Sequence, residues 1–263
     1  MPSPIPFDFA AAAPYIKILR DRNPLVHCMT NDVVQAFTAN VLLAIGACPA
    51  MIVEAEEVEG FVACADALLI NVGTITKTLA HSMALATDAA VMHQKPWVMD
   101  PVALGILPYR AGVVSRLLQA HPAVIRGNPA EILFMAGQAS MAKGPDSQNT
   151  ALSALNAAQG LAVRCQCVVA VTGEIDFITN GLKTYSVHGG HINLTRVTGT
   201  GCSLSAIVAA FVGCPGVDRL AATASACLLM KTAGQLAGSN AGLGSFAAAL
   251  LDQLTFLSDP LRA

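Results

Sequence analysis

The chain has 263 residues, of which 54% are hydrophobic and 12% are charged, and its formal net charge is −2 at pH 7. This composition excludes a disordered chain, and the charge balance offers no electrostatic basis for binding nucleic acid. No apolar run reaches the ~18 residues that a membrane-spanning helix needs, and the proline-broken start lacks the basic segment of a signal peptide. We therefore expect neither nucleic acid nor membrane as a partner.

The cysteines indicate the redox compartment of the chain, and the scarcity of charge indicates its state of association. Its eight cysteines are scattered through apolar segments without a Cys-x-x-Cys pair, which predicts buried thiols in a reducing cytoplasm rather than disulfides or a zinc site. So few charged residues indicate that part of the surface is covered, most simply by other copies of the chain. We expect a homo-oligomer.

Six continuously apolar runs predict buried β-strands, at residues 24–28, 49–53, 67–71, 96–100, 123–126 and 167–171. A hairpin is predicted over residues 176–186, around the turn signal Asn180-Gly181. Helices are predicted at 10–20, from the turn at 29–32 to about 45, from 54, from 75 to about 93, from 129, from a capping stretch at 143–147 to 164, from 202, at 218–237 and at 245–257.

The alternation of apolar strands with helices predicts the fold class. Strands without polar positions belong to parallel sheets that are covered by helices on both faces. No linker, repeat or break in composition divides the sequence. We therefore predict one α/β domain spanning residues 1–263.

The glycine-rich segment at residues 195–212 predicts a loop that leads into a helix. Gly199 and Gly201 flank Thr200, and the helix begins at about Cys202 with an apolar stripe formed by Leu204, Ile207, Val208, Phe211 and Val212. A helix start opened by glycines is a ready anion-binding site, because its first N–H groups have no partner within the helix. Turn geometry alone would also explain the two glycines.

Ligands of open parallel sheets bind beyond the carboxyl ends of the strands, so the residues at those ends are candidate site residues. They are Asn31, Asp32, Asn71, Gly73, Asp100, Arg126, Asn128, Glu131, Thr172, Gly173 and residues 199–202. Two carboxylates, an arginine and a glycine-rich helix start suit a triphosphate bound with Mg²⁺. Each carboxylate has an alternative role as a helix cap, and the arginine could simply pair with either of them.

Several motifs together resemble those of the hydroxyethylthiazole kinases, a branch of the ribokinase-like family. They are NPLVHCMTNDVV at 23–34, LINVGT at 69–74, DPV at 100–102, IRGN at 125–128 followed by Glu131, VTGE at 171–174 and VTGTGC at 197–202. The resemblance extends from about residue 23 to 246. Because it combines six motifs over nearly the whole chain, it is far more specific than any one glycine pattern.

The resemblance implies an activity, a fold and an assembly. The activity is transfer of the ATP γ-phosphoryl group to the primary hydroxyl of 4-methyl-5-(2-hydroxyethyl)thiazole, a salvage step toward thiamine. The fold is a ribokinase-like three-layer α/β fold, with a mostly parallel sheet, helices on both faces and no separate lid domain. The assembly is a homotrimer with active sites at subunit contacts.

The resemblance also implies roles for individual residues on the ATP side. Arg126 and Thr172 would bind the phosphates of ATP. Asp100 and Glu131 would lie at the same phosphates and organise Mg²⁺.

On the acceptor side, Met51 and Gly199 would contact the thiazole, with Asn31 close by. The Gly199 and Gly201 backbone would stabilise the transferred group, and Cys202 would face the acceptor hydroxyl. Other ribokinase-like relatives carry Asp at the Cys202 position, where it acts as a base. A helix N-terminus can lower the pKa of a thiol, so a thiolate base is one interpretation. Because phosphoryl transfer depends mainly on positioning, we expect Cys202 to assist without being indispensable.

Three other functions fit parts of the sequence. Cys202 could act as a nucleophile with His188 or His191 as its base, although this leaves the carboxylates and Arg126 unexplained. A nucleotide sensor without catalysis could use the same fold. A kinase for another alcohol, such as hydroxymethylpyrimidine, would differ only in an apolar acceptor pocket.

Overall fold

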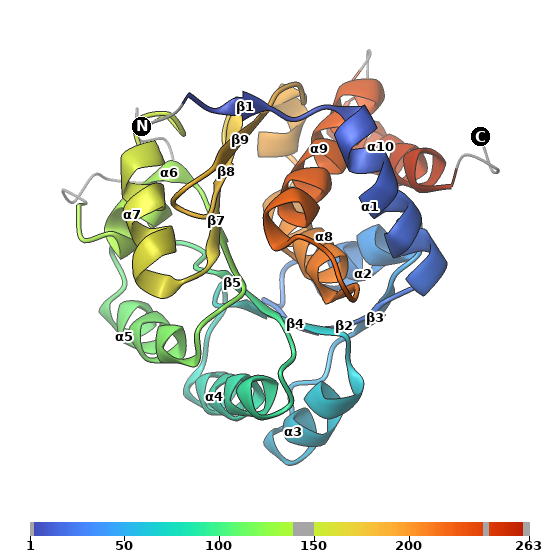
Figure 1. Cartoon of the computed structure of the whole chain (residues 1–263). Coiled ribbons are helices and arrows are strands. Elements are labelled where there is room, and N and C mark those ends of the chain that lie inside the picture. The colour runs from blue at the N-terminus through green and yellow to red at the C-terminus, as the bar shows by residue number, and fades with distance from the viewer. Residues whose placement is uncertain (1–2, 139–149, 239–241, 260–263) are drawn as a thin grey trace.

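The computed structural model describes residues 3–138, 150–238 and 242–259 of the chain, which form a central sheet covered by helices (Figure 1). Within these residues the sheet has the strand order β1-β9-β8-β7-β6-β5-β4-β2-β3. The strands are β1 (Ile5–Pro6), β2 (Leu25–Met29), β3 (Cys48–Ala50), β4 (Ala67–Asn71), β5 (Trp97–Asp100), β6 (Val124–Gly127), β7 (Val168–Val171), β8 (Asp176–Thr179) and β9 (Thr184–Val187). Neighbours from β3 to β7 pair in parallel, and β8 is antiparallel to both β7 and β9.

Helices cover both faces of this sheet and make three layers (Figure 1). One face carries α1 (Phe9–Arg22), α2 (Gln35–Ala44), α8 (Thr200–Gly213), α9 (Arg219–Ala237) and α10 (Leu243–Ser258). The other face carries α3 (Ala55–Cys64), α4 (Lys77–Met92), α5 (Pro108–Leu117), α6 (Pro129–Met135) and α7 (Leu155–Cys165). Two 3₁₀ turns, η1 (Leu118–Ala120) and η2 (Ile192–Thr195), complete the connections. The predicted three-layer α/β fold is confirmed.

The central strands are apolar throughout because their side chains enter two separate cores. In β4, Ala67 and Leu69 belong to the core beneath α8 and α9, whereas Leu68 and Ile70 belong to the core beneath α3 and α4. All five residues of β4 are buried. A strand covered on both faces has no position left for an exposed polar side chain.

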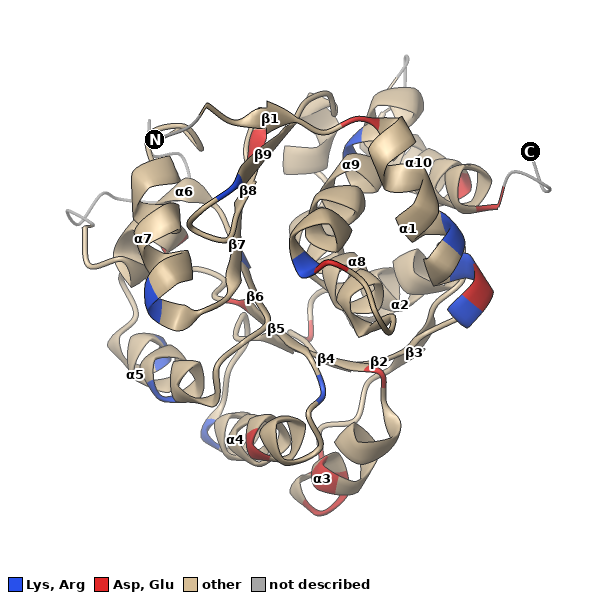
Figure 2. Cartoon of the chain, in the orientation of Figure 1, with Lys and Arg blue, Asp and Glu red and all other residues tan. Residues whose placement is uncertain are grey.

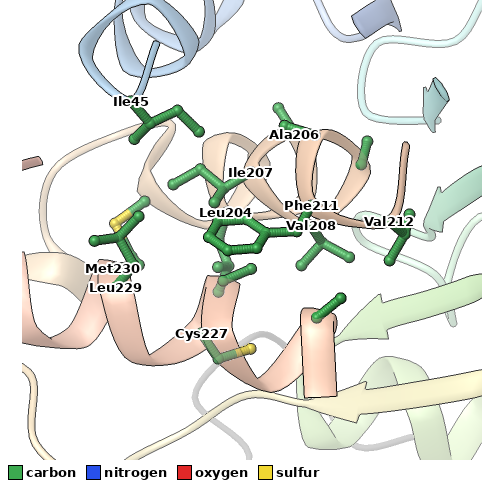
Figure 3. Close-up of a cluster of buried hydrophobic side chains, with 14 of the residues drawn as sticks. Ile45, Leu204, Ala206, Ile207, Val208, Phe211, Val212, Cys227, Leu229 and Met230 are labelled. Atoms are coloured by element: carbon green, nitrogen blue, oxygen red, sulfur yellow. The ribbon is translucent and has the colours of Figure 1, made fainter. Parts of the chain in front are cut away.

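Helix α8 is the most deeply buried helix of its layer, because it lies against the sheet, α2 and α9 (Figure 3). Every side chain from Ser203 to Val212 is buried. The predicted apolar stripe is confirmed, and its Leu204 and Phe211 face the α9 side that carries Cys227 and Met230. The other side of α8, which includes Ala206, is buried as well. The start of this helix is therefore fixed by the core of the protein.

Charged residues are sparse over the helices, and α2 and α8 carry none (Figure 2). Among the helices described, none combines the length and apolar character needed to span a bilayer. Several large apolar side chains are exposed, among them Leu43 of α2 and Val53 beyond β3. These residues leave apolar surface beside the β3 edge of the sheet.

Two details of the strands differ from the prediction. The strand expected at 49–53 ends at Ala50, because β3 is an edge strand whose pairing with β2 ends at the His27–Ala50 pair. The chain then turns, and His27 Nε2 lies 2.8 Å from the carbonyl oxygen of Ile52. The two-residue strand β1 was not predicted, because Ile5–Pro6 is too short to leave a pattern. The hairpin of β8 and β9 is confirmed.

The helices differ in three places. Helix α2 has Val34 as its N-cap without a capping side chain, because Asn31 is hydrogen-bonded elsewhere. Helix α5 was not predicted, since only Val113, Val114 and Leu117 of its residues are buried. The capping stretch expected at 143–147 lies outside the described residues, and α7 begins only at Leu155.

The expectation of uniformly buried thiols was wrong for half of the cysteines. Cys48 and Cys64 are exposed and Cys165 and Cys202 are partly buried, because they lie at the ends of helices and on an edge strand. The remaining four are buried, and all eight are free thiols.

Candidate active site

The carboxyl ends of the parallel strands meet at one edge of the sheet, where a cavity of about 860 Å³ opens. The loops after β5, β6 and β7 and the start of α8 form its walls. Ten of the residues singled out from the sequence line it, namely Asp100, Arg126, Asn128, Glu131, Thr172, Gly173, Gly199, Thr200, Gly201 and Cys202. The structure therefore brings most of the candidate residues to a single cavity.

The start of α8 is shaped for a close approach by an anion. Its N-cap, Gly199, has a left-handed backbone with φ of 96° and provides no side-chain cap, so the first N–H groups stay available. A Cβ atom on Gly201 would lie 3.2 Å from Arg126 Nη1. The missing side chain lets the guanidinium lie directly beside the helix N-terminus, where both attract negative charge.

The carboxylate of Asp100 is completely buried and is held on one side only. Its Oδ2 atom accepts hydrogen bonds from Asn71 Nδ2 at 2.8 Å and from Ser205 Oγ at 2.9 Å. Its Oδ1 atom is buried without a hydrogen-bond partner among the described residues. Burial raises the pKa of Asp100, whereas Arg126, Ser205 and Asn71 act to lower it. One oxygen is thus fixed and the other remains available to a ligand.

Arg126 joins the β6 end to the β7 end of the cavity. Its Nη2 donates to Thr172 Oγ1 at 2.7 Å, and its Nη1 lies 3.9 Å from Asp100 Oδ1. Burial acts to lower the pKa of Arg126, but the charges of Asp100 and Glu131 keep this pKa above its ordinary value. The guanidinium is a permanent, immobilised positive charge in the cavity wall.

Glu131 is a helix cap and also lines the cavity. It closes a capping box on α6, in which its Oε2 accepts from the backbone N–H of Asn128 at 2.8 Å. Its Oε1 accepts from the backbone N–H of Ala103 at 2.9 Å, and the residue also lines the cavity. Burial, followed by the nearby charge of Asp100, raises the pKa of Glu131 to about 7. The cavity thus contains two carboxylates that repel each other.

These two carboxylates could hold a divalent cation. A bound cation would give the unpartnered Asp100 Oδ1 a partner and would offset the repulsion between Asp100 and Glu131. Within the described residues, no group of three or more His, Cys, Asp or Glu side chains could hold a metal ion alone. This donor set suits Mg²⁺, which binds through one or two carboxylates and completes its shell with phosphate oxygens and water.

Cys202 lies at the opening of α8, on the first turn. Its Sγ accepts a hydrogen bond from Asn31 Nδ2 at 3.4 Å, and the same amide group donates to Asn71 Oδ1 at 3.0 Å. Burial, followed by the charge of Asp100, raises the pKa of Cys202 above the ordinary value of 9.0. This direction argues against a thiolate base at Cys202, because burial disfavours the charged form of a thiol.

Met51 and Asn31 lie outside the lining of the cavity. Met51 follows β3 at the same edge of the sheet and is partly buried against the core. Asn31 is buried and reaches the site through its hydrogen bond to Cys202. The site of this single chain therefore lacks Met51.

The histidines give no support to a cysteine–histidine pair. His191 stacks on Phe246 and accepts a hydrogen bond from the backbone N–H of Asn193. His188 is exposed. His27 is buried in β2, as expected of a core histidine.

Three polar residues of the site were missed in the sequence. Ser205 holds Asp100, and the buried pair Lys231 and Asp176 lines the far wall of the cavity. Lys231 had a signal, because it is the one charged residue of α9 after its first position. Ser205 had none, since a serine one turn into an apolar helix is common.

Comparison with known proteins identifies the family. Residues 16–259 match the family model described as Hydroxyethylthiazole kinase family. The chain belongs to this family. It is 54% identical over 237 residues to a hydroxyethylthiazole kinase of Klebsiella pneumoniae (strain 342), covering 90% of this chain and 92% of the relative. It is 51% identical over 259 residues to that of Tolumonas auensis, covering 98% and 96%.

Solved structures agree with the family and with the fold. The hydroxyethylthiazole kinase protein of Pyrococcus horikoshii OT3 superposes with a TM-score of 0.86 at 37% identity, covering 94% of this chain and 93% of that chain. A ribokinase-like superfamily protein of Enterococcus faecalis V583 has a TM-score of 0.63 at 14% identity, covering 92% and 94%. The fold of this hydroxyethylthiazole kinase family member is ribokinase-like, and no separate lid domain is evident within residues 3–138, 150–238 and 242–259.

Proposed function

We propose that the chain transfers the γ-phosphoryl group of ATP to the primary hydroxyl of 4-methyl-5-(2-hydroxyethyl)thiazole, a salvage step in thiamine biosynthesis. Family membership supports a kinase that acts on an alcohol. The proposal rests on one observation: a single cavity is lined by Arg126, Asp100 and the uncapped start of α8. This combination suits a group whose negative charge grows or moves during transfer.

The phosphate side of the reaction is assigned to four side chains and to backbone N–H groups at the start of α8. Arg126 and Thr172 bind the ATP phosphates, since they are hydrogen-bonded to each other in the cavity wall. Asp100 and Glu131 hold Mg²⁺, which when bound neutralises phosphate charge and orients the phosphoryl group. The N–H groups at Gly199, Gly201 and Cys202 stabilise the oxygens of the transferred group. Because these dipoles are fixed by the core, they need little reorganisation during the reaction.

The acceptor side is assigned to Gly199, Asn31, Cys202 and Met51. Cys202 is a neutral thiol at pH 7, so it contacts the acceptor hydroxyl without having to remove its proton beforehand. A loose transition state makes little demand on a strong base. As the new P–O bond forms and the bond to ADP breaks, the acceptor proton passes to an oxygen of the transferred phosphoryl group. The hydrogen-bonded pair of Asn31 and Cys202 keeps the acceptor hydroxyl in line.

The position of Met51 supports the proposed homotrimer. We assign the thiazole contact to Met51, whose soft thioether suits a sulfur heteroaromatic ring. It lies outside the cavity of one chain, close to the exposed apolar residues around β3. A homotrimer whose sites lie at subunit contacts would bring this edge to the cavity of a neighbouring copy. Analytical ultracentrifugation tests this, and a purely monomeric chain at micromolar concentration would rule it out.

A coupled ADP-release assay with ATP and Mg²⁺ tests the activity. Hydroxyethylthiazole is compared with hydroxymethylpyrimidine, with pyridoxal and with a control that lacks an acceptor. We expect turnover with the thiazole alone. Turnover on another alcohol would overturn the assignment of the acceptor and leave the phosphate side intact. ATP binding without any turnover would instead favour a nucleotide sensor.

A further inference from the structure

A buried lysine lies in the wall of the cavity, at a distance in sequence from every motif of the site. Lys231 is 6% exposed and comes from the apolar interior of α9, where Leu228, Leu229 and Met230 precede it. It lines the same cavity as Arg126 and Thr172. A lysine is almost never buried to this degree unless each of its protons has a partner.

The ammonium group of Lys231 binds two separate loops. Its Nζ donates to the carbonyl oxygens of Gly173 and Glu174 at 2.9 Å each and to that of Gly189 at 3.4 Å. It also forms an ion pair at 3.3 Å with Asp176 Oδ1, which itself accepts from the backbone N–H of Gly173 at 2.9 Å. The loop between β7 and β8 and the loop after β9 are therefore joined through one side chain.

Both loops need such a restraint. The first contains Thr172, which accepts the hydrogen bond from Arg126 and directly precedes Gly173. The second contains Gly189 and Gly190, both left-handed with φ of 95°, in a backbone that glycine leaves intrinsically free. Lys231 thus acts one residue away from the Arg126–Thr172 pair, on the wall that faces the phosphates.

We propose that Lys231, held by Asp176, is a positioning residue for the nucleotide: it fixes the Thr172–Gly173–Glu174 segment and the Gly189 carbonyl as one preformed wall of the ATP site. The proposal rests on the proposed function for the identity of the nucleotide. Buried ion pairs contribute little net stability compared with apolar residues of similar size. The retention of a charged pair in this wall is therefore better explained by the geometry it imposes than by stability.

The proposal separates nucleotide affinity from both folding and acceptor affinity. Lys231→Met replaces the lysine with an unbranched side chain that is one heavy atom shorter and removes all its donors. Because this leaves Asp176 buried and unpaired, the double variant Lys231→Met/Asp176→Asn removes the charge of both partners. Lys183→Met is the matched control, since Lys183 is exposed at the hairpin turn, at the opposite end of β8 and β9 from the cavity.

Isothermal titration calorimetry with ATP and Mg²⁺, and separately with hydroxyethylthiazole, tests the role of Lys231. We expect the Kd of ATP to rise about tenfold in the double variant, the loss expected for hydrogen bonds made by a charged group, and the Kd of the thiazole to stay unchanged. Hydrogen exchange should accelerate at residues 172–174 and 188–190 and nowhere else. The Lys183 control should match the unaltered chain in both measurements.

Every other outcome counts against the proposal. Unchanged ATP affinity in a folded variant, or equal loss of ATP and thiazole affinity, would overturn the positioning role while leaving the proposed function intact. Failure of both variants to fold would show that Lys231 serves the fold rather than the nucleotide. If the unaltered chain does not bind ATP, the proposed function is overturned first, because that measurement involves no substitution at Lys231.

Discussion

Replacing Cys202 with alanine separates two mechanisms for handling the proton of the acceptor. Burial, followed by the charge of Asp100, raises the pKa of this thiol, so it is protonated at pH 7. An essential thiolate base would contribute about 10²- to 10⁴-fold to the rate. Our assignment leaves Cys202 only its contact with the acceptor and the hydrogen bond from Asn31. We therefore expect kcat of Cys202→Ala to fall by about tenfold at most.

The same assay gives a second, independent readout from its pH dependence. With a thiolate base, log kcat of the unaltered chain would rise with unit slope between pH 7 and 9, because the ionised fraction grows tenfold for each pH unit. We expect no such slope. The assay is ADP release at saturating ATP, Mg²⁺ and thiazole, with Cys202→Ser as a control that retains a hydrogen-bond acceptor for Asn31. A folded Cys202→Ala variant without detectable turnover, or a unit slope, would refute the reasoning.

Three further predictions concern the supports of the site. Ser205→Ala removes one of the two hydrogen bonds that orient Asp100, so kcat/KM should fall about tenfold in steady-state kinetics; an unchanged value in a folded variant would contradict this. Gly199→Ala puts a side chain on a backbone with φ of 96°, within 3.2 Å of apolar side chains at the start of α2. Urea denaturation should therefore show that the free energy of unfolding falls by about 1–3 kcal/mol. An unchanged free energy of unfolding would count against this geometry. In the folded chain the pKa of Glu131 is about 7, against an ordinary value of 4.5, so folding favours its protonated form. Without divalent cations, the free energy of unfolding should therefore fall by about 3 kcal/mol as the pH rises from 4.5 to above 7. Glu131→Gln should remove this fall, and identical pH profiles of the two proteins would exclude the pKa shift.

The fold was predictable because its central strands leave a strong pattern. A run such as residues 67–71 is apolar at every position, which only a strand buried on both faces requires. Elements without such a pattern were missed. Helix α5 buries only one narrow side, and β1 has two residues whose pairing partner, β9, lies about 180 residues later in the sequence. Contacts of this kind are set by tertiary structure and leave no local signal.

The candidate site was predictable to the extent that its residues end the strands. Topology brings Asp100, Arg126 and Thr172 together without any knowledge of side-chain geometry. The same rule says nothing about residues that enter from helices, which is why Ser205 and Lys231 were missed. It also could not give the direction of the Cys202 pKa, because that depends on how completely the thiol is desolvated.

The burial of α8 has a consequence for the lifetime of the site. Catalytic segments commonly belong to the least stable parts of a protein and open locally many times before the whole molecule unfolds. Here the donors at the start of α8 belong to a helix enclosed by the sheet, α2 and α9, with every side chain from Ser203 to Val212 buried. We expect the α8 amides beyond the first turn to be among the slowest in the chain to exchange with solvent. The α8 side of the site then opens only when the whole fold unfolds, and local opening is confined to the loops opposite it.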